Sequence, residues 1–179
     1  MKRTLGILLI LVMVLSLGMA NAQTYSAWND NIRSAGTDLT SIGYFTKEDR
    51  IIEAGSTDLF ANDGYGNQYS SLIYSNTCEG MIEYRLGGNY TTLNATVYIP
   101  DFAMKNGHDH QWSTASISIY ADNQYLGCVS GFSAYDAPQP IRVNVEDVNF
   151  LRFEFDNVCY YYHGMEYALA VIGNATLYK

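Results

Sequence analysis

Two runs of alternating apolar and polar residues, separated by a Gly-Gly-Asn turn, constrain the fold of this chain more than any other feature. Residues 82–86 and residues 93–99 each place an apolar side chain at every second position. Because successive side chains of a strand point to opposite faces, this period predicts two strands that each bury one face. A pair of such strands predicts a sheet protein. The apolar positions are Ile82, Tyr84, Leu86, Leu93, Ala95, Val97 and Ile99.

Short apolar or alternating stretches recur along the rest of the chain, with Gly, Pro, Asn and Asp between them. No stretch has a convincing helical period. Regularly spaced short strands with turn signals predict an antiparallel sandwich or barrel. The further expected elements are 39–45 (a strand or turn), 47–54 (a strand or short helical turn), 69–74, 115–121, 125–129, 141–145, 151–155, 167–172 and 175–178.

Three connections carry specific signals. Asp122-Asn123 predicts a two-residue hairpin turn, since both residue types tolerate a positive φ. Residues 131–140 hold two prolines, which do not fit the interior of a strand ladder, so a loop is expected there. Gly173-Asn174 predicts a turn between the last two strands.

The first 22 residues have the pattern of a secretory signal peptide. Lys2 and Arg3 form a basic start, Leu5 to Met19 is almost wholly apolar, and Ala20-Asn21-Ala22 is a small-x-small cleavage signal. A membrane anchor is the alternative, but the run is shorter than the ~20 residues that a bilayer requires. We expect a secreted protein with a signal peptide (1–22), a flexible leader (23–38) and one domain (39–179), with no membrane span after removal of the signal.

Charge and cysteine content limit the partners and the covalent links. The chain has 18 acidic against 10 basic residues, which argues against nucleic acid and against anionic membrane surfaces as partners. In an oxidising compartment Cys78, Cys128 and Cys159 allow one disulfide, with three alternative pairings, and one free thiol. Three free thiols are the other alternative.

The order of these elements resembles the NPCBM family, also classed as carbohydrate-binding module family 51 (CBM51). The resemblance covers residues 39–179 and implies an antiparallel jelly-roll β-sandwich of the galactose-binding-like type. It also implies a non-catalytic role in binding carbohydrate. The segments that carry it are Leu39-Thr40-Ser41-Ile42, Gly66-Asn67-Gln68-Tyr69, Ile82 to Leu93, Ala115 to Leu126, Val148 to Phe155, and Glu166-Tyr167-Ala168 up to Ala175-Thr176-Leu177.

The sequence departs from the family at three points. Asp122-Asn123 stands where members usually carry Asp-Gly, and Tyr167 stands where many have an Asp with a Trp nearby. Residues 159–163, Cys-Tyr-Tyr-Tyr-His, match no family motif. These departures affect the identity of the sugar more than the fold.

The polar segment 101–113 is the first candidate binding loop. An aromatic ring on a loop can stack on the apolar face of a sugar, while amide and imidazole groups bond its hydroxyls. The alternative is that the tryptophan plugs one end of the sandwich. The predicted sugar-binding residues here are Asn106, His108, His110 and Trp112.

Residues 160–163 are a second candidate part of the sugar-binding site and could form a second wall of it. Alternation sends Tyr161 and His163 to one face and Tyr160 and Tyr162 to the other, so one of the two pairs is expected in the core. Tyr161 and His163 are the predicted binding pair. Weaker candidates of the same type are Tyr65 with Asn67, and Tyr135 with Asp136.

Metal and catalytic signals are sparse. His108 and His110 could share one ion, but no other His or Cys lies near them in sequence, and a solvated loop is the alternative. A structural Ca²⁺ is a further hypothesis, since sandwich modules of this kind often carry one; Asp58, Asp63 and Glu166 are conceivable ligands. No Ser-His-Asp order, nucleophile elbow or glycosidase carboxylate pair is visible, so we do not expect an enzyme.

The favoured hypothesis is therefore a secreted module that binds carbohydrate, galactose-type sugars being one expectation, through loops at one end of the sandwich. The alternative is a secreted structural or protein-interaction domain on the same scaffold, without affinity for sugar.

Overall fold

The structure is a computed structural model, which describes residues 35–77, 79–102, 116–131, 136–156, 159–162, 165–168 and 170–179. The predicted signal peptide (1–22) and most of the predicted leader lie outside these residues. The elements are β1 (Thr37–Asp38), the 3-10 helix η1 (Leu39–Ile42), β2 (Tyr44–Lys47), β3 (Ile51–Gly55), β4 (Ser71–Ser75), β5 (Gly80–Arg85), β6 (Thr92–Tyr98), β7 (Ser116–Ala121), β8 (Gln124–Ser130), β9 (Gln139–Asn144), β10 (Phe150–Asp156), β11 (Cys159–Tyr162), β12 (Met165–Ala168) and β13 (Val171–Tyr178).

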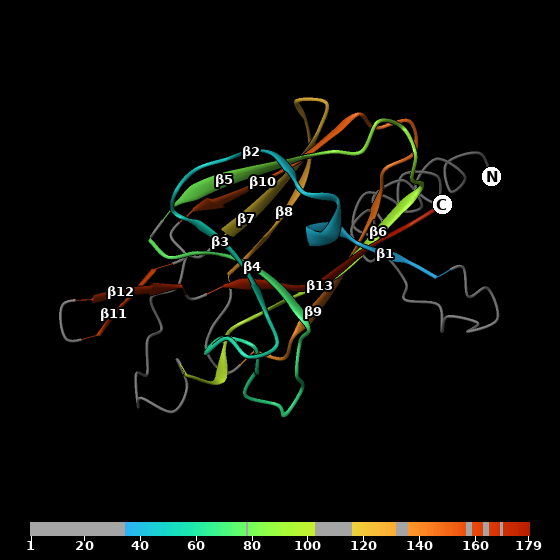
Figure 1. Cartoon of the computed structure of the whole chain (residues 1–179). Coiled ribbons are helices and arrows are strands. Elements are labelled where there is room, and N and C mark those ends of the chain that lie inside the picture. Colours follow the sequence, from blue (N-terminus) through green and yellow to red (C-terminus); the bar gives the residue numbers. More distant parts are fainter. Residues whose placement is uncertain are drawn as a thin grey trace, which may run out of the picture. The chain divides into compact units, whose positions relative to one another are not determined.

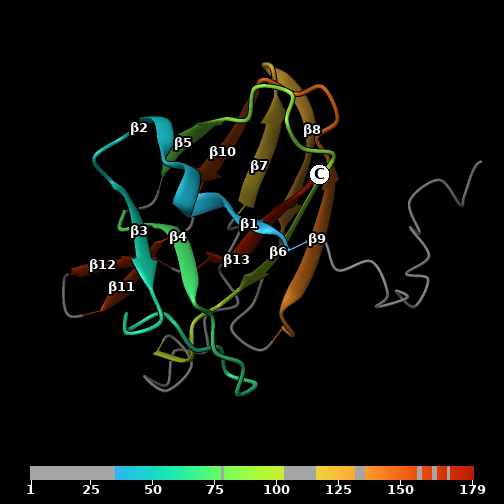
Figure 2. The ribbon, with the colours of Figure 1, turned by 45° about the vertical axis from the view of Figure 1, so that its right-hand side comes forward.

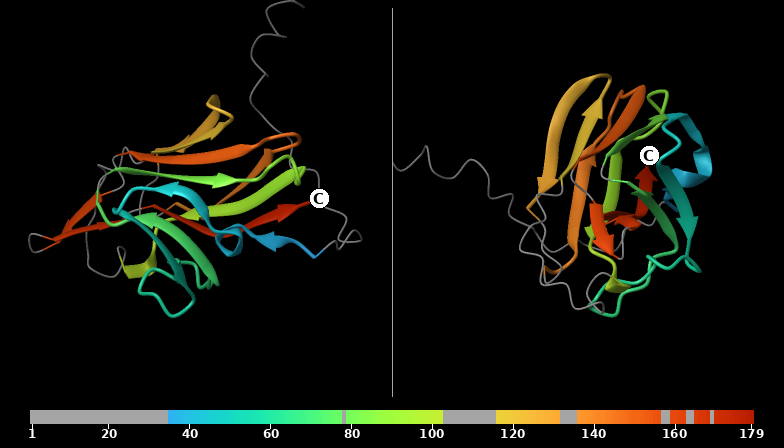
Figure 3. Two further views of the ribbon diagram at one scale, coloured as in Figure 1. Left: turned by 45° about the horizontal axis from the view of Figure 1, so that its top comes forward. Right: turned by 90° about the vertical axis from the view of Figure 1, so that its left-hand side faces the viewer.

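These strands form two main antiparallel sheets (Figures 1 and 2). Sheet A has the order β3-β4-β13-β6-β9, and β1 pairs with β13 beyond the end of β4. Sheet B has the order β2-β5-β10-β7-β8, and β11 and β12 form a separate hairpin. Figure 1 and the left panel of Figure 3 put this hairpin at the end of the domain away from the C-terminal residue. The expected all-β antiparallel sandwich is confirmed.

The two alternating runs that opened the sequence analysis do not pair with each other. β5 bonds to β2 and β10 in sheet B, whereas β6 bonds to β13 and β9 in sheet A. The chain crosses from one sheet to the other through Gly87 and Gly88, whose φ angles are 62° and 68°. The amides of these glycines donate to the carbonyls of Asn149 and Val148, at 3.1 and 2.9 Å, which holds the crossing against the turn before β10. The apolar faces of β5 and β6 therefore meet across the sandwich.

The main core fills the space between the sheets. Fully burying a Leu, Ile or Phe side chain stabilises a fold by about 1.5–3 kcal/mol, so this cluster is the dominant favourable term. Its most deeply buried large side chains include Leu39, Ile51, Ile73, Ile82, Tyr84, Leu93, Ile117, Leu151 and Phe153.

One buried hydroxyl links the two sheets. Tyr84 of β5 is 0% exposed, and its hydroxyl donates to Oε1 of Glu53 on β3 at 2.6 Å. Burial first, and then the bond and the charge of Glu53, raise the pKa of Tyr84, so its phenol stays protonated over the working pH range. This charge-assisted bond connects the β3 edge of sheet A to a central position of sheet B.

Three expected elements differ in detail. Residues 39–42 form a 3-10 turn because Oδ1 of Asp38 accepts from the amide and hydroxyl of Thr40, at 2.8 and 2.7 Å. β9 begins at Gln139 and includes Pro140, which the ladder tolerates because β9 lies at the edge of sheet A, with β6 as its neighbour among the described strands. Asn174, with φ 50°, marks a bulge inside the continuous strand β13, so the expected turn there is wrong.

The hairpin turn predicted at Asp122-Asn123 is confirmed. Both residues have positive φ angles, 47° and 67°, as a type I′ turn requires. The Asp122 carboxylate also accepts from the amide of Phe150 at 2.8 Å, which ties the turn to the start of β10.

The long connection between β3 and β4, residues 56–70, covers the outer face of sheet A. It contributes to a second apolar cluster, in which the rings of Tyr69 and Tyr98 stack with centroids 4.0 Å apart. The hydroxyl of Tyr98 donates to the carbonyl of Phe60 at 2.7 Å. The buried members of the cluster are Phe60, Ala61, Tyr69, Leu72, Tyr74, Tyr98 and Val171.

Tyr84→Phe tests the link between the sheets. We expect the free energy of unfolding to fall by about 1.5–3 kcal/mol, the range for a hydrogen bond to a charged group, because the partly buried Glu53 carboxylate loses its donor. Urea denaturation measures this. Tyr44→Phe, at a tyrosine that is 49% exposed, is the control and should stay within about 0.5 kcal/mol of wild type. Equal stability of both variants would contradict the assignment.

Gly173→Ala tests the packing of the 56–70 connection. A Cβ at Gly173 would lie 2.8 Å from ring atoms of both Tyr69 and Tyr98. We expect a loss of about 1–3 kcal/mol, typical of overpacking, with faster proteolysis within residues 56–70. Gly55→Ala is the control, since its nearest atom would be 3.8 Å away. Unchanged proteolysis in Gly173→Ala would show that the stack is not what holds the connection.

Candidate functional site

Two long connections of the sandwich, 99–115 and 157–170, meet at one end, which we call the loop end. Tyr98 at the end of β6 pairs with Val171 at the start of β13, and Ser116 at the start of β7 pairs with Asp156 at the end of β10. The connections 99–115 and 157–170 therefore begin and end beside each other. The turns between β2 and β3, between β4 and β5, and between β8 and β9 lie at the same end.

All six predicted binding residues belong to these two connections. Tyr161 lies in β11, where its backbone pairs with Glu166 of β12. The other five lie outside the described residues, so their arrangement stays a prediction: Asn106, His108, His110, Trp112 and His163. Tyr135, one of the weaker candidates, also lies outside.

The described part of the loop end is built on Asp63. This side chain is only 3% exposed, and its carboxylate accepts four hydrogen bonds. Oδ1 accepts from the amides of Tyr65 and Asn67, each at 2.9 Å. Oδ2 accepts from Nδ2 of Asn67 at 2.8 Å and from the hydroxyl of Tyr69 at 2.9 Å. The carboxylate thus fixes the Gly-Tyr-Gly tip, which presents Tyr65 with 54% of its surface exposed.

Two opposing effects act on the pKa of Asp63. Burial raises it, but the bonds from Asn67, Tyr69 and Tyr65 favour the ionised form and leave the pKa below its usual 3.8. Burial first, and then the bond to this carboxylate and its charge, raise the pKa of Tyr69.

Asp63 also joins the 56–70 connection to the root of the 99–115 connection. Asp63 forms an isolated bridge with Pro100, and the amide of Asp101 donates to the carbonyl of Asn62 at 2.8 Å. Order in the 62–68 tip is therefore coupled to the first residues after β6.

Asp58 and Asp63 do not fit the calcium hypothesis. Calcium takes six to eight oxygen ligands, yet these carboxylates already accept from donors of the chain. For Asp58 the donors are the amide of Phe60, at 2.9 Å, and the hydroxyl of Tyr74, at 3.1 Å. Across the described residues, no group of three or more His, Cys, Asp or Glu side chains could hold a metal ion. The side chain of Glu166 lies outside this description.

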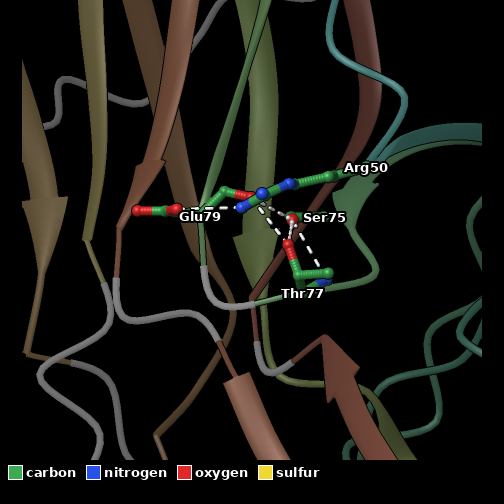
Figure 4. A network of polar contacts seen from close by, with 4 residues as sticks. All are labelled: Arg50, Ser75, Thr77 and Glu79. Carbon is green, nitrogen blue, oxygen red and sulfur yellow. Dashed lines mark hydrogen bonds and ion pairs between the residues drawn. The ribbon is translucent and has the colours of Figure 1, made fainter.

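The turn between β4 and β5 is fixed by a second polar network (Figure 4). Ser75, which is 0% exposed, donates to the carbonyl of Glu79 at 2.7 Å, and the hydroxyl of Thr77 donates to the same carbonyl at 3.0 Å. The Arg50 guanidinium reaches Oε1 of Glu79 at 2.8 Å and ties this turn to the turn before β3. Both charged side chains are at least half exposed, so the ion pair adds little stability, and the buried hydroxyl does more to fix the turn.

One cysteine is resolved as a free thiol. Cys128 is exposed on β8 and forms no disulfide, which leaves Cys78 with Cys159 as the remaining alternative for a bond. Cys78 and the side chain of Cys159 lie outside the described residues.

Sequence reasoning did not identify the structural role of Asp63. The signal was available, because Asp-Gly-Tyr-Gly-Asn is typical of a loop in which an Asx side chain bonds to amides two or more residues ahead.

Within the described residues, no helix has the length and apolar character needed to cross a membrane.

The geometry defines a class of fold: an antiparallel jelly-roll sandwich of the kind found in carbohydrate-binding modules. A CBM51 module of a Clostridium perfringens GH95 protein, solved with methyl-galactose, is 16% identical, with a TM-score of 0.56 over 79% of this chain and 99% of that chain. The tandem CBM51 modules of the family 98 glycoside hydrolase of Streptococcus pneumoniae are 13% identical, with a TM-score of 0.62 over 86% of this chain and 52% of that chain.

A third neighbour is the second CBM51 domain of C. perfringens ZmpB, solved with GlcNAc and joined to INT domains. It is 13% identical, with a TM-score of 0.61 over 79% of this chain. This chain spans 31% of that structure, and 15% of a longer ZmpB structure that includes an M60 catalytic domain. No family model and no curated protein sequence matches this chain. The CBM51-like fold expected from the sequence is thus supported by structure.

Asp63→Asn tests the organising carboxylate. We expect about 1.5–3 kcal/mol less stability at pH 7, because hydrogen bonds to a charged acceptor are lost. Because the folded pKa lies below 3.8, the contribution of Asp63 is present above pH 3.8 and is lost as the pH falls through the folded value.

The measurement is urea denaturation from pH 7 to pH 2. The difference between wild type and Asp63→Asn should shrink at the acid end. Asp49→Asn, at an exposed turn position, is the control and should follow the wild-type profile. A difference that stays constant with pH would exclude the charge of Asp63 as the cause.

Proposed function

We propose that this protein is a secreted, non-catalytic carbohydrate-binding module that binds glycans through the loop end of its sandwich. Galactose-type sugars are the first ligands to test. The observation that carries the proposal is the fold, because CBM51 modules with this fold include one solved with methyl-galactose and one solved with GlcNAc.

The topology of the loop end supports the proposed location. The connections 99–115 and 157–170 leave and re-enter the sheets at neighbouring strand positions, Tyr98 beside Val171 and Ser116 beside Asp156. We propose that Trp112 stacks on a sugar ring and that Asn106, His108 and His110 bond its hydroxyls, with Tyr161 and His163 as a second wall. A rigid scaffold with adaptable loops is the usual arrangement of a binding site.

The described loop end also has features that suit a small neutral ligand. The 62–68 tip is held by the buried Asp63, and it presents the exposed ring of Tyr65 near the root of the 99–115 connection. A loop whose backbone is fixed in advance loses little entropy on binding, which favours affinity for a weakly held sugar. The proposal includes no catalytic residue.

Isothermal titration calorimetry with methyl-β-galactoside, GlcNAc and their oligosaccharides tests the function, after a glycan array has selected the tightest ligand. We expect Trp112→Ala to weaken that ligand at least tenfold, since loss of a stacked ring removes about 1.4 kcal/mol or more. Tyr44→Ala, at an exposed tyrosine on β2, should leave the affinity within twofold of wild type.

Circular dichroism and thermal unfolding must show that each variant keeps the wild-type fold. If the folded wild-type protein binds no glycan on the array, the proposal fails, and the alternative of a structural or protein-interaction domain takes its place. Equal losses in Trp112→Ala and Tyr44→Ala would place binding elsewhere on the sandwich.

A further inference from the structure

The two outer faces of the sandwich differ. The 56–70 connection covers the outer face of sheet A and buries Leu72, Tyr74 and Tyr98. On sheet B none of the described outward side chains of β5, β10, β7 and β8 is buried. These strands lie side by side in Figures 1 and 2. The outward side chains that are partly or fully exposed include Glu83, Tyr120, Tyr125, Arg152, Glu154 and Asp156.

Four of these side chains form a straight row across the sheet. Strand register pairs Glu83 with Arg152, Arg152 with Tyr120, and Tyr120 with Tyr125. We call these four residues the tyrosine–arginine row. With neighbouring strands about 4.8 Å apart, the row extends roughly 14 Å, longer than one sugar ring.

Arg152 is held in place at the middle of the row. Its Nη1 donates to Oδ1 of Asn123 at 3.0 Å, and its Nε lies 3.0 Å from Oε1 of Glu154, at ion-pair distance but without the alignment of a good hydrogen bond. Its guanidinium also lies over the Tyr120 ring, 4.6 Å from the centroid. A guanidinium fixed by three neighbours presents its remaining donors in one geometry.

The aromatic end of the row is open. The rings of Tyr120 and Tyr125 meet edge to face with centroids 5.5 Å apart, and Tyr125 is 54% exposed. Tyr125 supplies an exposed ring for stacking. Arg152 and its neighbour Glu154, two strands away on β10, supply donors and acceptors for hydroxyl groups. This is the chemistry that saccharides require.

Charge selects among saccharides. On this face Glu83, Glu154 and Asp156 outnumber Arg85 and Arg152, and the chain has a net charge of −8. An anionic polymer would be repelled. A neutral chain has no such penalty, and its successive rings could follow the row.

We propose that the outer face of sheet B is a second saccharide-binding surface, on which a neutral oligosaccharide lies along the tyrosine–arginine row. This inference rests on the proposed function, because it assigns a second surface to the same class of ligand. Binding at both surfaces would favour a polymer over a single sugar through effective concentration. The competing explanation is that the row only stabilises the sheet through cross-strand pairs, as such pairs commonly do.

Amide NMR titration of the full chain separates these explanations. The probes are methyl-β-galactoside, galactotetraose, GlcNAc and chitotetraose. We expect a tetrasaccharide to shift the amides of 118–128 and 150–154. Shifts confined to the loop-end flanks, 99–102 and 170–172, would overturn this inference and leave the proposed function intact. No shift with any of the four probes would contradict both.

Matched variants give a second measurement. Tyr125→Ala should weaken the tetrasaccharide at least fivefold while the affinity for the corresponding single sugar changes less than twofold. Tyr125→Phe keeps the ring and should bind within twofold of wild type. Tyr44→Ala is the control, because Tyr44 is also about half exposed (49%) and has Lys47 over its ring, 4.9 Å from the centroid. Unchanged tetrasaccharide affinity in folded Tyr125→Ala would overturn the proposal.

Discussion

The rest of the domain depends on the burial of the apolar faces of β5 and β6 against each other. The chain crosses from sheet B to sheet A between these strands, so Ile82 and Tyr84 lie across the core from Leu93 and Val97. Each sheet is then extended by strands whose inward residues join the same cluster. Because this burial supplies most of the stability, the connections at the ends of the sandwich can vary in sequence without loss of the fold.

Polar groups fix features that the apolar core does not define, namely a link between the sheets and the conformations of a loop and a turn. Tyr84 and Glu53 join the two sheets, Asp63 fixes the 62–68 tip, and Ser75 fixes the turn before β5. Each has a buried oxygen that would be costly to leave without a partner, so each conformation is specified more narrowly than packing alone would require. Two of these three groups lie at the loop end, where the proposed function needs an ordered frame around variable connections.

The outer face of sheet A is covered by the chain, whereas that of sheet B has no buried outward side chain among the described residues of β5, β10, β7 and β8. A long connection covers sheet A and adds a second apolar cluster, whereas sheet B keeps aromatic and charged side chains open to solvent. Covering one face removes it from use as a binding surface. The proposals for this protein therefore concern the loop end and the open face of sheet B, which are separate surfaces of one scaffold.

The sequence alone determined the strand character of the chain, because a period of two reports which side chains can share a buried face. Alternation in 82–86, 93–99 and 151–155 and the Asp122-Asn123 turn predicted real elements. Only the tertiary structure decided that β5 and β6 face each other instead of pairing, and that Asn174, whose side chain accepts from the amide of Ser70, lies in a bulge. Both features depend on contacts with residues distant in sequence, and local periodicity carries no information about such contacts. The candidate residues from Asn106 to Trp112 came from the residue types of one polar loop, since no pattern in the chain fixes how a loop side chain points.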